Sequence, residues 1–445
     1  MNRQCLSLLS VFLSGPLYAD RATWVGTGDG ASWEDPDNWS WTSDVVPVPE
    51  DYPGSATSPG DVNVQIASPN GVDLAVSLTE ALNTTTVLRD LRFDAGPNGS
   101  VLDVNLLEGS QVIATQVGNT LLTINEGGSN GADCIARLNV AGSLTVGQIR
   151  MSRDADGPHS ELNILPEGDL IMTGGGQFVM RNEVATGTSI FRMTGGSFSS
   201  GGNRNLEMGS FDSQVHLSGN AVFDGENLTL KAHVAGASHS DKTSLISVSG
   251  SEIQLIAFKA IEGWNAASNP DGTSTFQFIT DGDGVTPIMV FGDTDLAGDA
   301  GGGDKPADLI VDLTNYPGAD DLVLFDLSSG TGTVMGEFGE ITLVSGTGDI
   351  DYGYNGGTQI ALTNIIKTAG PLPTGLVITS IEVDGSDVVL VWNDSSPNEY
   401  SLESSTDLSA GSWTLVSPTA ANGTFTDTGA LSAGPNRFYR LRENP

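Results

Sequence analysis

The chain has only two cysteines, Cys5 and Cys134, among its 445 residues. Cys5 lies in an N-terminal segment that we expect to be removed, which leaves one. A single cysteine allows neither an internal disulfide nor a cysteine-based metal site. We therefore expect Cys134 to be a small buried residue, and a long regular core to stabilise the protein.

Basic residues are also scarce. Lys and Arg number 18 against 55 Asp and Glu, a formal net charge of -37. Such a chain repels polyanions, which excludes nucleic acid and anionic lipid surfaces as partners. It attracts divalent cations, and it is equally typical of a protein kept soluble in a salty medium.

Beyond the N-terminus the sequence has no apolar run near the ~18 residues that a membrane-spanning helix needs. Residues 1–19 resemble a signal peptide, with Arg3 at the start, an apolar stretch over 6–13 and Ala19 at the end. We therefore expect an exported protein, extracellular or at the cell surface, with no transmembrane segment in the mature chain.

Recognisable catalytic residues are equally sparse, since there are four histidines. His233 and His239 lie near Asp241, but no nucleophile-elbow sequence accompanies them. Neither a metalloprotease helix motif nor a phosphate-binding glycine loop is present. The sequence assigns no catalytic residue and no organic cofactor.

What the chain does have is glycine, 57 residues, and a loose internal repeat. Each unit has a short strand of alternating apolar and polar residues, a glycine-containing corner and a further apolar residue. The leading apolar residues are Leu138, Leu162, Phe191, Val215 and Leu245. Repeats of this size with two or three strands each are typical of a parallel β-solenoid, in which inward residues stack from coil to coil.

The expected fold is all-β, a right-handed parallel β-solenoid followed by a small antiparallel β-sandwich. The solenoid is predicted over residues 67–365 and becomes irregular after about residue 260. Residues 20–66 hold four of the seven tryptophans and are interpreted as a cap over the first coil. The alternative for this cluster is a site where sugar rings stack on the indoles.

A proline-containing linker is predicted over residues 366–375. Six short strands crowd into residues 376–445, which is typical of a β-sandwich. Pro371 and Pro373 cannot donate to a continuous β-ladder. We therefore expect this last module to be an autonomous domain with Trp392 in its core.

Two parts resemble known families. The N-terminal region resembles the opening of exported bacterial β-solenoid proteins with autotransporter-type or pectin-lyase-like repeats. The residues that carry this resemblance are Trp24, Trp33, Pro36, Asn38–Ser40 and Gly60–Val64. A second series is similar to fibronectin type III-like modules: Val388–Trp392, Tyr400–Asp407, Trp413–Thr414, Phe425–Thr428 and Phe438–Arg440. These resemblances imply fold and export, and they imply no particular reaction.

An aspartate-rich loop is the candidate metal site. Asp293, Asp295, Asp299 and Asp304 share a spacing that resembles an EF-hand calcium loop, with Gly298 at the sharp turn. Ala297 stands where that pattern has an oxygen ligand, and Asp304 stands where it has glutamate. Calcium at these four residues is one hypothesis, and a solvated acidic loop is the other.

Two classes of function stay open. The first is a non-enzymatic structural or adhesive protein that contacts extracellular polysaccharide or cell-surface components. The alternative is a carbohydrate-active enzyme, a polysaccharide lyase or hydrolase on a β-helix. For a lyase, arginines in successive units would have to line one face: Arg150, Arg153, Arg181, Arg192 and Arg204. The same arginines also suit an ordinary solvated face.

Overall fold

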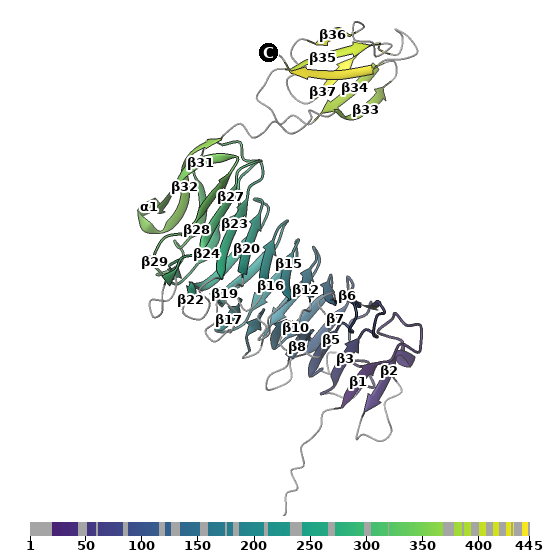
Figure 1. The fold of residues 1–445 in the computed structure, drawn as a ribbon. Coiled ribbons are helices and arrows are strands. Elements are labelled where there is room, and N and C mark those ends of the chain that lie inside the picture. Colours follow the sequence, from purple (N-terminus) through teal and green to yellow (C-terminus); the bar gives the residue numbers. More distant parts are fainter. Residues whose placement is uncertain are drawn as a thin grey trace, which may run out of the picture. The chain divides into compact units, whose positions relative to one another are not determined.

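The computed structural model describes residues 20–42, 51–58, 61–82, 88–114, 121–125, 134–151, 159–173, 176–180, 187–208, 212–231, 243–265, 272–297, 304–318, 320–367, 378–384, 387–392, 400–405, 413–417, 424–428, 430 and 438–443. The chain divides into two compact units, residues 1–366 and 367–445 (Figure 1). The expected signal peptide lies outside the described residues.

The N-terminal unit consists of two long sheets, which confirms the all-β expectation. The ten-stranded sheet is parallel throughout. Its strands, in order of pairing, are β4 (Leu74–Leu78), β6 (Val101–Leu106), β9 (Ile135–Val140), β12 (His159–Ile164), β15 (Thr188–Met193), β18 (Asp212–Leu217), β20 (Thr243–Ser249), β23 (Thr273–Ile279), β27 (Asp308–Asp312) and β30 (Ile341–Val344).

The twenty-stranded sheet is mostly parallel, with antiparallel pairs at its two ends, β1 with β2 and β28 with β32. Its strands are β1 (Arg21–Trp24), β2 (Trp39–Thr42), β3 (Asn63–Ala67), β5 (Asp90–Asp94), β7 (Gln111–Ala114), β8 (Leu121–Ile124), β10 (Ser143–Val146), β11 (Gln148–Met151), β13 (Asp169–Met172), β14 (Phe178–Val179), β16 (Ser197–Ser200), β17 (Arg204–Glu207), β19 (Val222–Lys231), β21 (Leu255–Glu262), β24 (Ile288–Val290), β25 (Thr294–Asp295), β28 (Leu322–Asp326), β29 (Val334–Met335), β31 (Gly346–Gly353) and β32 (Gln359–Lys367). Strands β22 (Trp264–Asn265) and β26 (Asp304–Lys305) form a separate antiparallel pair. Short helical turns occur at η1 (Pro36–Asn38) and α1 (Tyr354–Gly357).

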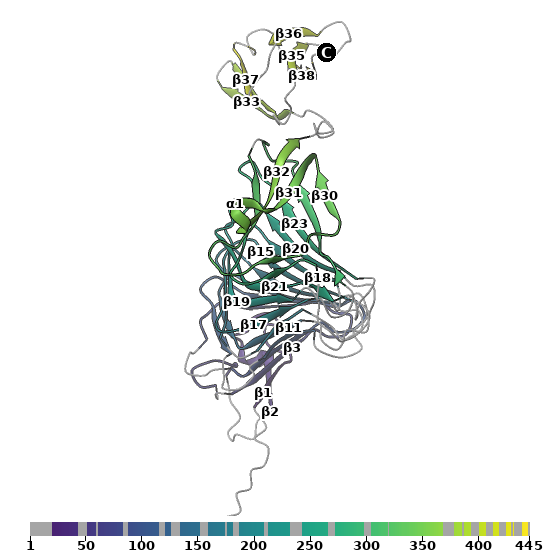
Figure 2. The same cartoon turned by 90° about the vertical axis from the view of Figure 1, so that its left-hand side faces the viewer.

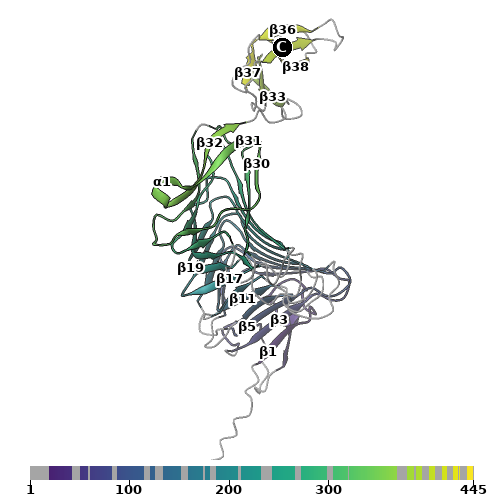
Figure 3. The same ribbon diagram turned by 60° about the vertical axis from the view of Figure 1, so that its left-hand side comes forward.

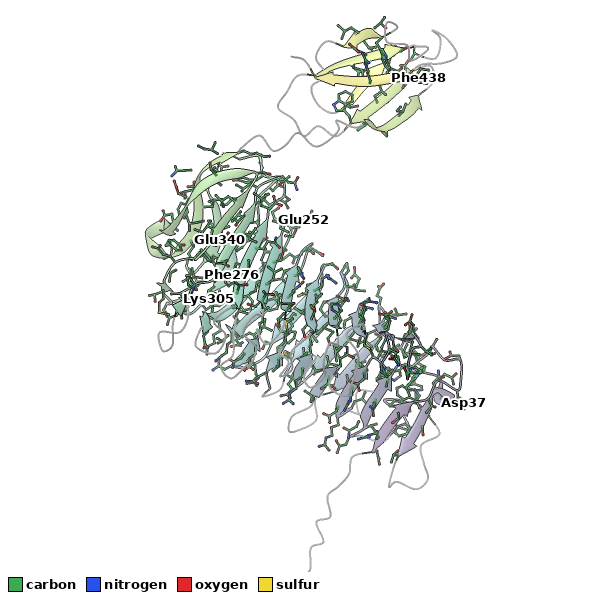
Figure 4. All side chains as sticks on the ribbon, in the orientation of Figure 1. Asp37, Glu252, Phe276, Lys305, Glu340 and Phe438 are labelled. Carbon is green, nitrogen blue, oxygen red and sulfur yellow. The ribbon has the colours of Figure 1, made fainter. Side chains whose placement is uncertain are left out.

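The core lies between the sheets and is built from columns of apolar side chains in register. Strands such as β6, β9 and β12 have period-two burial, so one face points inward and the other outward. One inward column of the ten-stranded sheet, followed strand by strand, is Val104, Leu138, Leu162, Phe191, Val215, Ile246, Phe276 and Leu309. Figure 4 marks Phe276 among these strands. Cys134 is buried, as expected.

In β20, the repeat pattern assigns the inward position to a residue one place too early in the sequence. It predicts Leu245 in the inward column, but Ile246 is the residue that pairs with Val215 and is fully buried. Leu245 points outward. Both residues are apolar, so the pattern alone does not choose between them, and a shift of one residue exchanges the two faces of a strand.

Glycine corners are required where the chain turns between the sheets. Gly196 joins β15 to β16 with φ of 67°, a conformation that costs L-residues energy. A Cβ atom there would lie 2.4 Å from the carbonyl oxygen of Gly168 in the preceding unit. The close approach of successive units, as well as the turn itself, therefore excludes a side chain.

The C-terminal unit has two three-stranded antiparallel sheets. Their strands are β33 (Ile378–Asp384), β34 (Asp387–Trp392), β37 (Thr424–Asp427), and β36 (Thr414–Ser417), β35 (Tyr400–Ser405), β38 (Phe438–Glu443). All six lie where the sequence predicts strands. Val388, Leu390, Trp392, Leu402 and Ala430 form a core of their own.

Candidate functional site

The outward face of the ten-stranded sheet has an organised polar surface. We call the outward residues of β6, β9, β12 and β15 the polar face. Because the strands are in register, their outward residues form three columns that run across the sheet. The columns are Val101, Ile135, His159 and Thr188, then Asp103, Arg137, Glu161 and Ile190, then Asn105, Asn139, Asn163 and Arg192.

The third column is a ladder of asparagine amides. Asn139 donates from Nδ2 to Oδ1 of Asn105 at 2.9 Å, and Asn163 donates in the same way to Asn139 at 2.9 Å. Arg192 completes the series by donating from Nη1 to Oδ1 of Asn163 at 3.1 Å. Each of these donors therefore forms a hydrogen bond with the residue on the preceding strand, and these bonds fix the orientation of the side chains in the column.

Glu161 is the centre of a charged network in the adjacent column. Its carboxylate lies 2.8 Å from Nε2 of His159, 3.4 Å from Nε of Arg137 and 3.7 Å from Nη1 of Arg192. Arg137 also contacts Asp103 at 3.2 Å. The hydrogen bond from His159 lowers the pKa of Glu161 to about 2; burial opposes this effect, and Arg137 and Asn163 reinforce it.

This arrangement suits binding better than proton transfer. With a pKa of about 2, Glu161 is ionised at neutral pH and has no proton to donate. The same low pKa makes it a weak base. Two carboxylates, of Asp103 and Glu161, face two guanidinium groups, of Arg137 and Arg192, so these four charges balance within a strongly acidic chain.

We expect Glu161→Gln to lower the free energy of unfolding by about 2 kcal/mol at pH 7, since it removes a charged acceptor from several hydrogen bonds. The folded pKa of about 2 lies below the ordinary value of 4.5. Ionised Glu161 therefore stabilises the folded state above pH 4.5, and that stabilisation is lost as the pH falls toward 2. Urea unfolding at several pH values measures both effects.

Glu108→Gln is the matched control, because Glu108 is exposed in the turn after β6. Its change should stay within about 0.5 kcal/mol. A Glu161→Gln deficit that is the same at pH 7 and near pH 2 would contradict the linkage.

His216 extends the third column beyond Arg192, because it pairs with Arg192 in the register of β15 and β18. Its Nε2 lies 2.9 Å from Oε1 of Gln214. Burial, together with the charge of Arg192, lowers the pKa of His216. His216 is therefore neutral at pH 7 and presents a polar group without charge.

The arginines proposed for a lyase site do not share one face, which corrects that hypothesis. Arg192 lies on the ten-stranded sheet, whereas Arg150 and Arg204 lie on β11 and β17 of the twenty-stranded sheet. Arg153 and Arg181 lie outside the described residues. Arg192 directly follows Phe191 in the first strand of its unit, whereas Arg204 begins a later strand of the same unit, after the chain has turned onto the other sheet.

Three of the four N-terminal tryptophans are structural. Trp24, Trp33 and Trp39 are buried, and their rings pack edge to face at 5.1 and 5.2 Å. Trp33 donates from its indole to the carbonyl of Pro53, and Trp39 donates to the carbonyl of Trp33. A buried ring has no free face for a sugar, so these three residues do not form a stacking site.

The predicted calcium ligands are only partly described. Asp293 accepts hydrogen bonds from the backbone and hydroxyl of Thr333, and Asp295 accepts one from the backbone of Ala297. Asp304 begins β26, and its side chain lies outside the described part, as does all of Asp299. The described residues contain no group of three or more His, Cys, Asp or Glu placed to hold a metal. Calcium therefore stays a prediction.

His233, His239 and Asp241, considered for a hydrolytic triad, also lie outside the described residues. Among the residues that are described, no helix has the length and apolar character needed to cross a membrane.

The network around Glu161 was not predicted from the sequence. The sequence did hold a signal for it, because the two aligned repeats each have an asparagine two residues after a charged residue. These pairs are Arg137 with Asn139 and Glu161 with Asn163.

Searches against protein-family models, curated proteins and solved structures find no match to the chain. The function is therefore inferred from the geometry of the polar face and from the N-terminal sequence.

Proposed function

We propose that this chain is an exported, non-enzymatic structural or adhesive protein of a bacterial surface or matrix, and that its polar face contacts extracellular polysaccharide. The observation that carries the proposal is the in-register ladder of Asn105, Asn139, Asn163 and Arg192. Export rests on the N-terminal sequence alone.

We further propose that the two sheets are walls of a right-handed parallel β-solenoid. The order of the strands along the chain supports this, because β9, β12 and β15 alternate with pairs of strands from the other sheet. Each also pairs in parallel with its counterpart one unit later. The C-terminal unit is proposed as a β-sandwich similar to fibronectin type III modules, on the support of its two antiparallel sheets.

A polysaccharide fits the polar face because both are periodic. Sugar hydroxyl groups and side-chain amides both donate and accept hydrogen bonds. Because neighbouring strands lie about 4.8 Å apart, the amides on them also recur at regular intervals. The balanced charges of Arg137, Arg192, Asp103 and Glu161 also matter. They make a patch where a neutral or weakly anionic chain is not repelled by the net charge of -37.

A polysaccharide lyase is the second candidate, and one observation favours it. Arg137 and Arg192 lie within 4 Å of one carboxylate on the same face, which places two cationic groups where a uronate would need them. Against it, Glu161 is a weak base and Arg137 is already paired with two carboxylates.

Affinity electrophoresis in gels that contain neutral or uronate polysaccharides, with and without Ca²⁺, tests the proposal. We expect retardation by at least one polysaccharide. Asn163→Ala and Arg192→Ala should weaken it about tenfold, which corresponds to about 1.4 kcal/mol. Arg204→Ala, on the other sheet, is the matched control and should bind like the wild type.

Two results would overturn the proposal: no retardation by any polysaccharide, or retardation that Arg192→Ala leaves unchanged. Analysis of the same mixtures for unsaturated or reducing-end products decides between the candidates, because product formation would establish the enzyme. Binding without product supports the structural or adhesive role.

A further inference from the structure

In the described part of the chain, the last strand of the ten-stranded sheet, β30, has one edge that pairs with no other strand. Among the described residues it pairs only with β27. The backbone N–H groups of Leu309 and Leu313, in and just after β27, donate to the carbonyls of Glu340 and Val344. Because successive residues of a strand direct their backbone groups to opposite sides, the N–H and C=O groups of Ile341 and Leu343 face away from β27.

The opposite edge of this sheet is covered. In β4, Ser77 donates its N–H to the carbonyl of Ala31 and accepts from the N–H of Trp33, both at 2.9 Å. The N-terminal segment thus satisfies outer backbone groups of the first strand. The two ends of the sheet therefore differ, and β30 is the end at which a strand can be added.

The exposed side chains of β30 are apolar or uncharged. Ile341 is 42% exposed and Val344 is 39% exposed. Thr342 is exposed between them, and Leu343 packs in part against the core. An exposed apolar edge strand without charge is a template for another strand, and proteins normally protect such edges with lysine, proline or a bulge.

Exposed acidic residues precede and follow β30 in the sequence. Glu337 and Glu340 are exposed just before β30, and Asp349 and Asp351 are exposed on β31 just after it. Figures 2 and 3 show β30 and β31 at the same end of the N-terminal unit, and Figure 4 marks Glu340. A strand that docks here therefore meets apolar side chains on a strand that exposed carboxylates precede and follow in the sequence.

We propose that β30 is a docking edge for an extended, positively charged segment of a partner protein, which adds to the sheet as its next strand. Main-chain hydrogen bonds to Ile341 and Leu343 would supply the pairing. Lysine or arginine in the segment would complement the four carboxylates. A second copy of this chain is disfavoured because two copies would bring the same acidic residues together.

Synthetic peptides test the proposal on the full chain. The first probe alternates valine and lysine, the second alternates valine and glutamate, and the third is the valine–lysine peptide with central prolines. We expect binding of the first alone, weakening as salt screens the charges. Hydrogen exchange should slow at the amides of Ile341 and Leu343 when this peptide binds.

The double variant Ile341→Lys/Val344→Lys should lower affinity for the valine–lysine peptide at least about tenfold. Leu107→Lys is the matched control, because Leu107 is 41% exposed in the turn after β6, away from β30, and it should bind like the wild type. Equal thermal unfolding midpoints would show that all variants are folded.

Three results would each overturn the proposal. The double variant could bind the valine–lysine peptide as tightly as the wild type does, the valine–glutamate or proline peptide could bind as tightly as the valine–lysine peptide, or hydrogen exchange at Ile341 and Leu343 could stay unchanged. Dimerisation of the wild type at high salt that the double variant abolishes would also overturn it, because the edge would then belong to a second copy. The polysaccharide proposal is untouched by these outcomes, since its residues lie on β6 to β15.

Discussion

Replacing Phe198 with alanine is expected to lower the free energy of unfolding of the N-terminal unit by about 3–5 kcal/mol. Phe198 is fully buried, and its ring stacks on Phe223 with centroids 4.7 Å apart and planes 18° apart. It also contacts Phe191 and Phe178 at 5.9 and 6.2 Å. Four rings from both sheets thus meet, so the cavity left by one ring cannot be filled by a small shift of one strand.

Urea unfolding followed by tryptophan fluorescence measures this loss, because Trp24, Trp33 and Trp39 are buried in the same unit. Hydrogen exchange in β14, β16 and β19 reports the local effect, which matters because repeat proteins do not always unfold in one step. Phe438→Ala is the matched control, since Phe438 is 38% exposed in the other unit. A loss for Phe198→Ala below about 1 kcal/mol would contradict the packing argument.

Trp392→Ala is expected to unfold the C-terminal unit, or nearly so, at a cost of about 3–5 kcal/mol. Trp392 is 3% exposed, and it is the largest member of a core that otherwise holds Val388, Leu390, Leu402 and Ala430. Such a small core leaves little stability to lose, since domains of this size are marginal. In the full chain, the unfolding transition of the N-terminal unit should stay where it is.

The fragment 367–445 tests whether this unit is autonomous. We expect cooperative urea unfolding of the wild-type fragment, and little or no transition for the fragment with Trp392→Ala. Leu415→Ala is the control, because Leu415 is 58% exposed on β36. A wild-type fragment without cooperative unfolding would show that the unit depends on the rest of the chain.

Trp413 illustrates a limit of the sequence pattern in this unit. Like Trp392, it stands in an alternating stretch, so the pattern alone does not distinguish it from a core residue. It is only half-buried, and the guanidinium of Arg440 lies 4.2 Å from the centre of its ring. Tyr439 is half-buried against the core and donates from its hydroxyl to Asp427 at 2.9 Å.

The amino-acid sequence by itself determined the β character of the chain, the position of many strands and four of the five leading residues that face inward. Alternation of apolar and polar residues is a local property, and it predicted β9, β12 and β15 as well as the six C-terminal strands. Glycine at corners such as Gly196 is also readable locally, since its φ of 67° excludes most other residues.

Only the tertiary structure decided which outward residues meet. Asn105, Asn139, Asn163 and Arg192 are separated along the chain by 34, 24 and 29 residues, yet each bonds to the next. The connecting segments differ in length, so no fixed spacing in the sequence predicts this column. Register is set by the packing of inward columns such as Leu138, Leu162 and Phe191, and a shift of one residue, as at Leu245, exchanges inside for outside.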